Sequence, residues 1–290
     1  SPEWMGFEPG EVDCDLGWRR SAGFCKELEP RRSMEHAAFG PAIRTLQTQA
    51  RGQDLVCPVV RRFGNHWLEM NMAEIVAVTG ANGFVGRALC AEAVRRGLTV
   101  RGITRSPCIL PAGVENVAVG NVDGETDWTA ALAGCDVVIH LAARVHIMND
   151  KSRDPLAEFR RVNTLGTTRL AQAAIAARVR RLVNVSSIGV NGPNTEGELK
   201  FTDQDIPDPH NPYSVSKWEA EQALRTIVAT GQIEVVTVRP PLIYGPGVGG
   251  NFLRLLGAVY RGIPLPLGLT RNFRDLLFVG NLADFLIVCA

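Results

Sequence analysis

Short runs of β-branched and other apolar residues alternate with longer amphipathic segments from residue 75 onward. A short continuous apolar run indicates a strand buried on both faces, and an intervening helix lets successive strands lie parallel. We therefore expect an α/β fold with a doubly wound parallel sheet. The expected strands are 75–79, 100–104, 114–119, 136–141, 181–186 and 234–238, and the expected helices are 85–96, 128–133, 155–178 and 212–229.

The first expected strand runs directly into a glycine-rich turn, Gly80-Ala81-Asn82-Gly83-Phe84-Val85-Gly86, and then into a helix. Glycines let the backbone turn sharply and approach a phosphate, while the start of a helix supplies unpaired N–H groups. This strand, turn and helix order predicts a Rossmann-type dinucleotide site, although the spacing is GxxGxxG rather than GxGxxG. The alternative is a simple tight turn. The predicted cofactor contacts here are Gly80, Asn82, Gly83, Phe84, Val85 and Gly86.

The residues at the end of the second expected strand help to distinguish NAD from NADP as the cofactor. It reads Thr104-Arg105-Ser106 and carries no acidic residue. An acidic side chain at this point usually holds the ribose 2′-hydroxyl of NAD, whereas an arginine suits a 2′-phosphate. The sequence thus predicts NAD(P) as cofactor, with NADP(H) favoured over NAD(H), unless Arg105 is only a surface residue.

A tyrosine and a lysine stand four residues apart in Pro212-Tyr213-Ser214-Val215-Ser216-Lys217, at the expected start of a helix. The chain has only three tyrosines and few lysines, so a chance pair on a solvated helix face is the weaker interpretation. Residues at this spacing share one helical face. We expect the Lys217 ammonium to lower the pKa of the Tyr213 phenol from its ordinary value of about 10 and so to form an acid/base pair.

Further motifs follow the glycine turn in a fixed order. They are His140-Leu141-Ala142-Ala143, Asn163 within Val162-Asn163-Thr164-Leu165-Gly166-Thr167, Val185-Ser186-Ser187, Tyr213 with Lys217, and Arg239-Pro240-Pro241-Leu242-Ile243-Tyr244-Gly245. Over about residues 73–290 the chain resembles the extended short-chain dehydrogenase/reductases, in the NAD(P)-dependent epimerase/dehydratase group that acts on nucleotide sugars.

The resemblance implies roles for the matching positions. Tyr213 is the acid/base, Lys217 lowers its pKa and holds the nicotinamide ribose, Ser187 binds the substrate oxygen, and Asn163 helps to position Lys217. On sequence alone, Asn163 could equally be a solvent-facing residue, and we expect His140 to be a packed residue rather than a base or ligand. Further implied cofactor contacts are Asn121, Val122, Leu141, Ala142, Ala143, Ser186 and Pro240, and the implied diphosphate contacts of the substrate are Asn251 and Arg274.

The segment after Ser187 narrows the expected reaction. Ile188 and Gly189 stand where sugar 4,6-dehydratases of this group carry an Asp-Glu pair, so we do not expect that elimination. What remains is an epimerase or 4-keto reductase acting on a nucleotide sugar, with a UDP-sugar favoured. Within the enzyme class, the alternative is a reductase of a non-sugar carbonyl, of the dihydroflavonol or hydroxysteroid type. Outside it, the alternative is a non-catalytic NAD(P)-sensing protein.

Three regions are expected. Residues 1–71 show no sustained periodicity and are rich in Pro, Gly, Arg and Trp. We expect an extension that is poorly ordered or not native, with Met72 as the natural start, or else a small accessory domain. Residues 72–240 are expected to form the NAD(P)-binding domain, and 241–290 a partial substrate domain that we expect to be truncated, because the chain stops inside an apolar helix.

Composition excludes several classes of partner. The formal net charge is +1, which gives no electrostatic reason to expect nucleic acid or a membrane surface. Seven cysteines are scattered without CxxC pairs, and the histidines show no ligand spacing, so we expect reduced thiols, no metal and a cytoplasmic location. The resemblance also implies a possible homodimer through the helices expected at 155–178 and 212–229.

Overall fold

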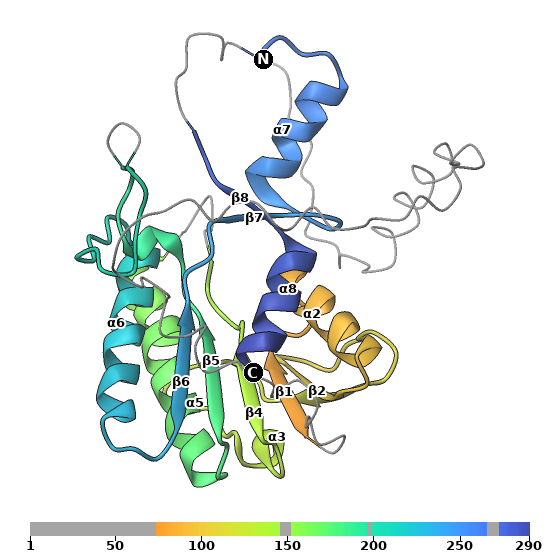
Figure 1. The fold of residues 1–290 in the computed structure, drawn as a ribbon, viewed down its shortest axis with the longest axis vertical. Helices are drawn as coiled ribbons and strands as arrows, with labels where there is room; N and C mark the ends of the chain where they lie inside the picture. The colour runs from red at the N-terminus through yellow and green to blue at the C-terminus, as the bar shows by residue number, and fades with distance from the viewer. Residues whose placement is uncertain (1–73, 146–151, 196–198, 266–272) are drawn as a thin grey trace, which may run out of the picture. The chain divides into compact units, whose positions relative to one another are not determined.

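The computed structural model describes residues 74–145, 152–195, 199–265 and 273–290. The region predicted as an extension, 1–71, lies outside these ranges. Six parallel strands form one sheet in the order β3-β2-β1-β4-β5-β6, which is the doubly wound order that the sequence predicted (Figure 1). The strands are β1 Ile75–Thr79, β2 Thr99–Thr104, β3 Val114–Ala118, β4 Val137–His140, β5 Arg181–Val185 and β6 Glu234–Val238.

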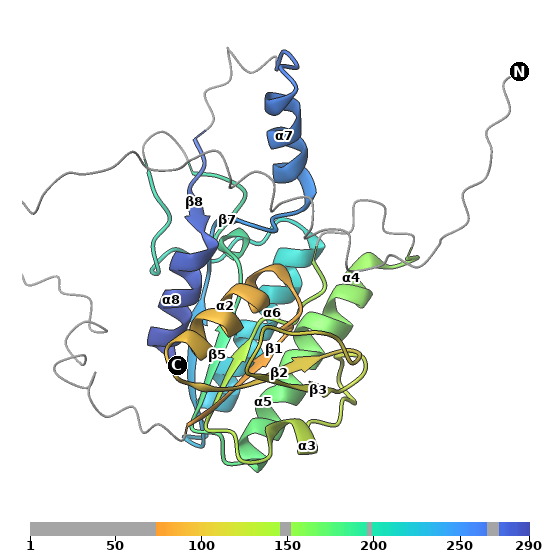
Figure 2. The same cartoon turned by 90° about the vertical axis from the view of Figure 1, so that its right-hand side faces the viewer.

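Helices cover both faces of this sheet (Figures 1 and 2). On one face, α2 and α8 pack over β1, β4 and β5, with Leu89, Cys90, Leu282 and Leu286 in the core. On the other face, Leu170 of α5 and Leu224 of α6 pack on Val138 and Leu182. The helices are α2 Phe84–Arg95, α3 Thr129–Leu132, α4 Pro155–Phe159, α5 Gly166–Ala176, α6 Pro212–Val228, α7 Gly250–Tyr260 and α8 Val279–Cys289.

The helix expected at 155–178 is not uniform. Between α4 and α5 the backbone forms a π-helix, η3 Arg160–Leu165, and the whole segment begins at Asp154, whose carboxylate caps the Ala157 N–H. A π-helical turn inside an α-helix contains an extra residue and is frequent at functional sites. The sequence pattern did not predict this turn, because the apolar spacing continues through it.

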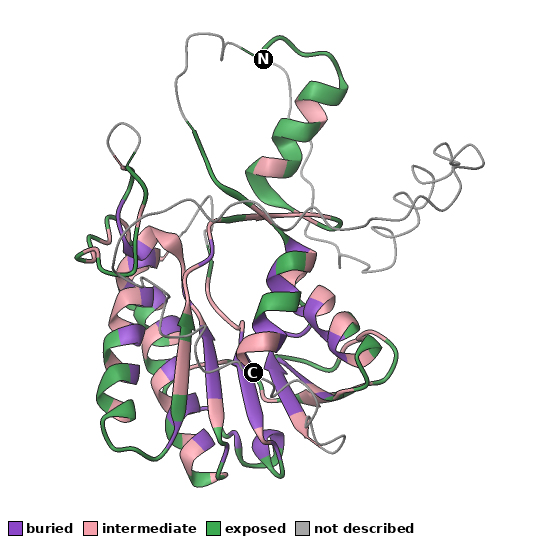
Figure 3. Cartoon of the chain, viewed as in Figure 1, coloured by how far each residue is buried: buried purple, intermediate pink, exposed green. Residues whose placement is uncertain are grey.

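The segment after β6 contains both elements that are largely exposed and a helix that packs into the core. Strands β7 Leu242–Tyr244 and β8 Leu276–Phe278 form a separate parallel pair, and no residue of α7 is buried (Figure 3). Helix α8, in contrast, packs against α2 and adds its buried residues to the core of the large sheet. The boundary predicted at 240/241 stays a prediction.

Candidate active site

The glycine turn after β1 is built so closely that larger residues do not fit. The N–H of Gly80 donates to the Ile103 carbonyl, and the N–H of Gly83 donates to the Gly80 carbonyl, both at 2.9 Å. Gly80 has a φ of +69°, and a Cβ at this position would lie 2.9 Å from the Ala142 nitrogen. The turn is thereby packed against the loop that follows β4.

The turn leaves the start of α2 open to a ligand. Gly83 is the N-cap and offers no side-chain cap, and the first turn contains no acidic residue. The N–H groups of the first helical residues Phe84, Val85 and Gly86 thus have no partner within the helix, which makes the helix start attractive to an anion. Asn82 and Gly83 are exposed beside it. These residues fit the pyrophosphate of NAD(P).

A chain of hydrogen bonds ties the loop after β4 to helix α5 through His140. The Thr79 hydroxyl accepts from the N–H groups of Leu141 and Ala142 at 3.1 Å and lies 2.7 Å from His140 Nδ1. On the other side of the ring, Nε2 lies 3.0 Å from the Thr167 hydroxyl, which itself donates to the Asn163 carbonyl. The Thr167 proton is therefore in use, so Nε2 donates and Nδ1 accepts from Thr79.

His140 is neutral in this arrangement. The side chain is fully buried, and burial, with a smaller effect of the Lys217 ammonium, lowers the pKa of His140 to about 3. A neutral imidazole matches the one donor and one acceptor that its two neighbours require. His140 is thus the packed residue that the sequence predicted, and its hydrogen bonds hold the segment at Leu141, Ala142 and Ala143.

Asn163 lies in the π-helix η3 and is completely buried. Its Oδ1 accepts from the Arg144 N–H at 2.8 Å, and its Nδ2 donates to the Arg144 carbonyl and to the Ser216 hydroxyl, both at 3.0 Å. The Ser216 hydroxyl donates in turn to the Tyr213 carbonyl at 2.7 Å. Asn163 therefore bridges the loop after β4 and the first turn of α6, and it is not a solvent-facing residue.

Helix α6 begins where its sequence provides a capping box. Asn211 Oδ1 accepts from the Ser214 N–H at 2.9 Å, the Ser214 hydroxyl lies 3.2 Å from the Asn211 N–H, and Pro212 occupies the first helical position. This start places Tyr213 and Lys217 on consecutive turns. The Tyr213 ring meets the Phe159 ring edge-on at 6.1 Å between centroids, and Lys217 is 2% exposed.

The structure brings Ser187 to Tyr213. The Ser187 side chain acts to lower the pKa of the Tyr213 phenol, although 26 positions separate the two residues in the chain. Ser187 also caps the short 3-10 helix η4 Ile188–Val190, because its hydroxyl accepts from the Gly189 N–H at 3.2 Å. The predicted Ser187, Tyr213 and Lys217 therefore gather between the end of β5 and the start of α6.

The expected downward shift of the Tyr213 pKa is wrong for this structure. Burial raises the pKa of Tyr213, and the hydrogen bond with Ser187 opposes that rise without reversing it. Burial also lowers the pKa of Lys217 to about 8, against the attraction of the Glu221 carboxylate. Desolvation acts on both groups because each charge is removed from water.

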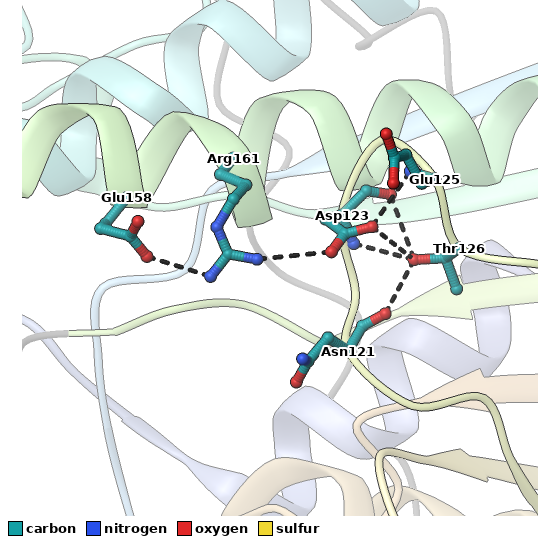
Figure 4. Close-up of polar contacts among 6 residues, drawn as sticks. All are labelled: Asn121, Asp123, Glu125, Thr126, Glu158 and Arg161. Carbon is teal, nitrogen blue, oxygen red and sulfur yellow. Dashed lines mark hydrogen bonds and ion pairs between the residues drawn. The ribbon is translucent and has the colours of Figure 1, made fainter.

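The loop after β3 presents Asn121. The Thr126 hydroxyl accepts from the Asp123 N–H and lies 2.8 Å from the Asn121 carbonyl, while Arg161 of η3 pairs with Asp123 and Glu158 (Figure 4). The Asn121 amide points away from this cluster (Figure 4). Val122 packs against Gly166 at the start of α5, where an added Cβ would lie 2.9 Å from the Val122 side chain.

The remaining predicted contacts are spread more widely. Arg105 is exposed just beyond β2, Ser186 is buried at the end of β5, and buried Pro240 accepts from the Ile188 N–H at 3.1 Å. Asn251 in the first turn of α7 and Arg274 just before β8 are both exposed. Sequence analysis missed Thr79, Thr167 and Ser216. Ser216 had one signal, its place beside Lys217, whereas the two threonines had none.

The part of the chain that the structure describes contains neither a group of metal-binding side chains nor a helix suited to a membrane span. Within it, no group of three or more His, Cys, Asp and Glu side chains could hold a metal ion. No described helix is long and apolar enough for a membrane span.

Comparisons with known proteins agree with this geometry. A profile of the NAD dependent epimerase/dehydratase family matches residues 76–290. UDP-glucose 4-epimerase of Vibrio cholerae is 38% identical over 232 residues, which span 76% of this chain and 68% of that protein. Dihydroflavonol 4-reductase of Dianthus caryophyllus is 31% identical over 61% of this chain and 54% of its own.

Solved structures lead to the same family. MoeE5, solved in complex with UDP-glucose and NAD, is 31% identical and superposes with a TM-score of 0.64 over 74% of this chain and 71% of its own. This TM-score indicates that the two proteins share a fold. The chain therefore belongs to the NAD dependent epimerase/dehydratase family of oxidoreductases and isomerases.

Proposed function

We propose that this protein is an NAD(P)-dependent 4-epimerase of a UDP-sugar. The observation that carries the proposal is the placement of the buried Lys217 one helical turn after Tyr213 on α6, with the Ser187 hydroxyl acting on the Tyr213 phenol. A phenol held by a serine beside an ammonium suits proton transfer to and from a sugar hydroxyl. The similarity to a UDP-glucose 4-epimerase supports this substrate class.

In this proposal Tyr213 moves the proton and Ser187 binds the same substrate oxygen. When bound, NAD(P) supplies a reversible hydride acceptor, which the start of α2 and the loop at 141–143 hold. Lys217 has a pKa of about 8 and so remains mostly charged at neutral pH. Its positive charge stabilises the phenolate form of Tyr213, which is the form that accepts the proton of the sugar hydroxyl. Asn163 fixes the turn of α6 that carries both residues.

The cofactor form and the substrate contacts complete the proposal. NADP(H) is favoured over NAD(H) because Arg105 is exposed at the end of β2, where no carboxylate would repel a 2′-phosphate. The solved relative MoeE5 contains NAD, so the two forms need a direct comparison. Arg274 and Asn251 are proposed to bind the diphosphate, since an arginine fork suits phosphate oxygens. A homodimer through the helical segments 155–178 and 212–229 is also proposed.

The second candidate is a 4-keto reductase, either of a nucleotide sugar or of a non-sugar carbonyl. The similarity to dihydroflavonol 4-reductase favours it, and the same serine, tyrosine and lysine would serve. The two activities differ in whether the keto compound forms in the site and takes the hydride back, or arrives from solution.

The test is turnover of a panel of UDP-sugars, run in parallel with NAD(H) and NADP(H). Formation of the 4-epimer without net consumption of reduced cofactor supports the epimerase. Stoichiometric consumption with a 4-keto sugar, or with a dihydroflavonol, supports the reductase instead. In Tyr213→Phe we expect turnover to fall on the order of 10²–10⁴-fold, with cofactor affinity unchanged. Unchanged turnover in this variant would refute the role of Tyr213.

A further inference from the structure

A buried carboxylate lies directly behind the proposed catalytic residues. Glu221 of α6 is 3% exposed and follows Lys217 by one helical turn. Its Oε1 accepts from the Ser186 hydroxyl at 2.5 Å and from Arg239 Nε at 3.0 Å, and its Oε2 accepts from the other end of the Arg239 guanidinium at 2.6 Å. Glu221 thus binds the residue next to Ser187 and the arginine that directly follows β6.

Arg239 is itself held on three sides. It follows β6, and besides Glu221 it donates to Asn191 Oδ1 at 3.0 Å, while its guanidinium lies 5.7 Å from the centre of the Trp218 ring. Asn191 comes directly after η4, and its amide donates to the Thr202 carbonyl at 3.0 Å. The pair Glu221–Arg239 therefore joins α6, the end of β5, the turn at η4 and the end of β6.

An ion pair of a buried Glu221 and an Arg239 whose side chain is only 16% exposed needs a reason, because removing charges from water costs about as much free energy as their attraction returns. An apolar pair of similar size would hold these elements together equally well for stability. An apolar pair would not, however, form the directional hydrogen bonds that fix the orientation of neighbouring groups. Ser186 and Ser187 are consecutive, so the short bond from Ser186 to Glu221 fixes the backbone from which the Ser187 hydroxyl reaches Tyr213.

We propose that Glu221 and Arg239 are positioning residues, which hold the Ser187 hydroxyl against Tyr213 and keep a negative charge one turn from Lys217. This rests on the proposed function for its catalytic consequence, but its structural claim concerns only the contact between Ser187 and Tyr213. Glu221 is also the group whose attraction favours the charged form of Lys217.

The structural claim is tested without turnover. In protein labelled with [13C]tyrosine, the Tyr213 signal is assigned by its loss in Tyr213→Phe, and Ser187→Ala shows how it moves when its partner is deleted. We expect Glu221→Gln to move the signal in the same direction as Ser187→Ala. The control is Glu219→Gln on the same helix, where the carboxylate pairs with Arg160 at the surface, and it should leave the signal in place. An unmoved signal in a folded Glu221→Gln variant overturns the proposal.

The catalytic claim uses a matched pair of variants. Glu221→Gln should lower kcat on the order of 10- to 100-fold, with a smaller change in KM, since small displacements of catalytic groups have effects of this size. The double variant Glu221→Met, Arg239→Met removes both charges and should be folded, as judged by urea denaturation, even if the single variant is not. We expect its kcat to stay low and its Tyr213 signal to stay displaced.

The outcomes separate the two proposals. If the double variant regains both the wild-type Tyr213 signal and the wild-type kcat, the ion pair is only structural and the inference is wrong. If the wild-type protein turns over no UDP-sugar, the proposed function fails, while the Tyr213 signal still decides whether Glu221 positions Ser187.

Discussion

Replacement of Gly86 by alanine tests whether the glycine turn is as closely packed as the structure indicates. Gly86 lies in the first turn of α2, where alanine should favour the helix by about 1 kcal/mol. A Cβ at this position, however, would lie 2.2 Å from the Gly80 carbonyl oxygen and 2.8 Å from the Ala81 Cα. Ordinary contacts are 3.4–4 Å, and both neighbours are backbone atoms that cannot rotate away.

The loss of stability caused by this overlap follows from the backbone movement that the added Cβ requires. Because the Gly80 carbonyl also accepts from the Gly83 N–H, α2 and the turn have to separate, and overpacking of this kind costs about 1–3 kcal/mol or more. We expect Gly86→Ala to lower the free energy of unfolding by that amount. We also expect weaker binding of NAD(P), since the start of α2 moves away from the turn.

The matched control is Gly257→Ala, another change from glycine to alanine within a helix. No atom lies within 4 Å of a Cβ at Gly257 in α7, so the free energy of unfolding should stay the same or rise by up to about 1 kcal/mol. Urea denaturation followed by circular dichroism gives the stability of both variants, and calorimetry gives their cofactor affinity. If Gly86→Ala is as stable as Gly257→Ala and binds cofactor as well as wild type, the close packing of the turn is refuted.

Two further predictions concern buried polar groups on one face of the sheet. Because burial lowers the pKa of His140 to about 3, between pH 6.5 and 3 the unfolded chain binds a proton that the folded protein does not, and stability falls with falling pH by up to about 1.4 kcal/mol per pH unit. In His140→Gln the free energy of unfolding should fall less steeply as the pH is lowered from 7 to 4, as measured by urea denaturation. If the pH dependence of stability is the same as in wild type, the neutral buried ring is contradicted. Asn184 in β5 is fully buried, and neither of its amide atoms has a hydrogen-bond partner among the described residues. Asn184→Leu should therefore raise the free energy of unfolding by about 1–3 kcal/mol, whereas a loss of stability in the same assay would show that the amide is satisfied.

The order of strands and helices was predictable because it depends on local patterns. The strands expected at 75–79 and 181–186 became β1 and β5, and the helix expected at 212–229 became α6. The helix expected at 155–178 was predicted as one piece, and its π-helical turn was missed. That turn is stabilised by partners on α6, such as Ser216, which the sequence near Asn163 does not reveal.

The pKa of Tyr213 shows the limit of reasoning from spacing. A tyrosine four residues from a lysine suggested a lowered pKa, but the structure buries both side chains. Burial opposes the charged form of each group, and its size depends on how many atoms from other segments surround the site. The pair Glu221–Arg239 was missed for the same reason, although an acidic residue one turn after Lys217 was visible in the sequence.

The sequence by itself determined the glycine turn after the first strand, the alternation that makes the sheet parallel, and the shared helical face of Tyr213 and Lys217. Each of these follows from residues close together in the chain, where backbone geometry sets the distances. Only the tertiary structure decided that Ser187 lies beside Tyr213, that His140 is neutral between two threonines, and that the Arg239 guanidinium pairs with the Glu221 carboxylate. Those contacts join segments that are 18 or more residues apart in the chain, and they form because buried polar groups need hydrogen-bond partners that the fold brings to them.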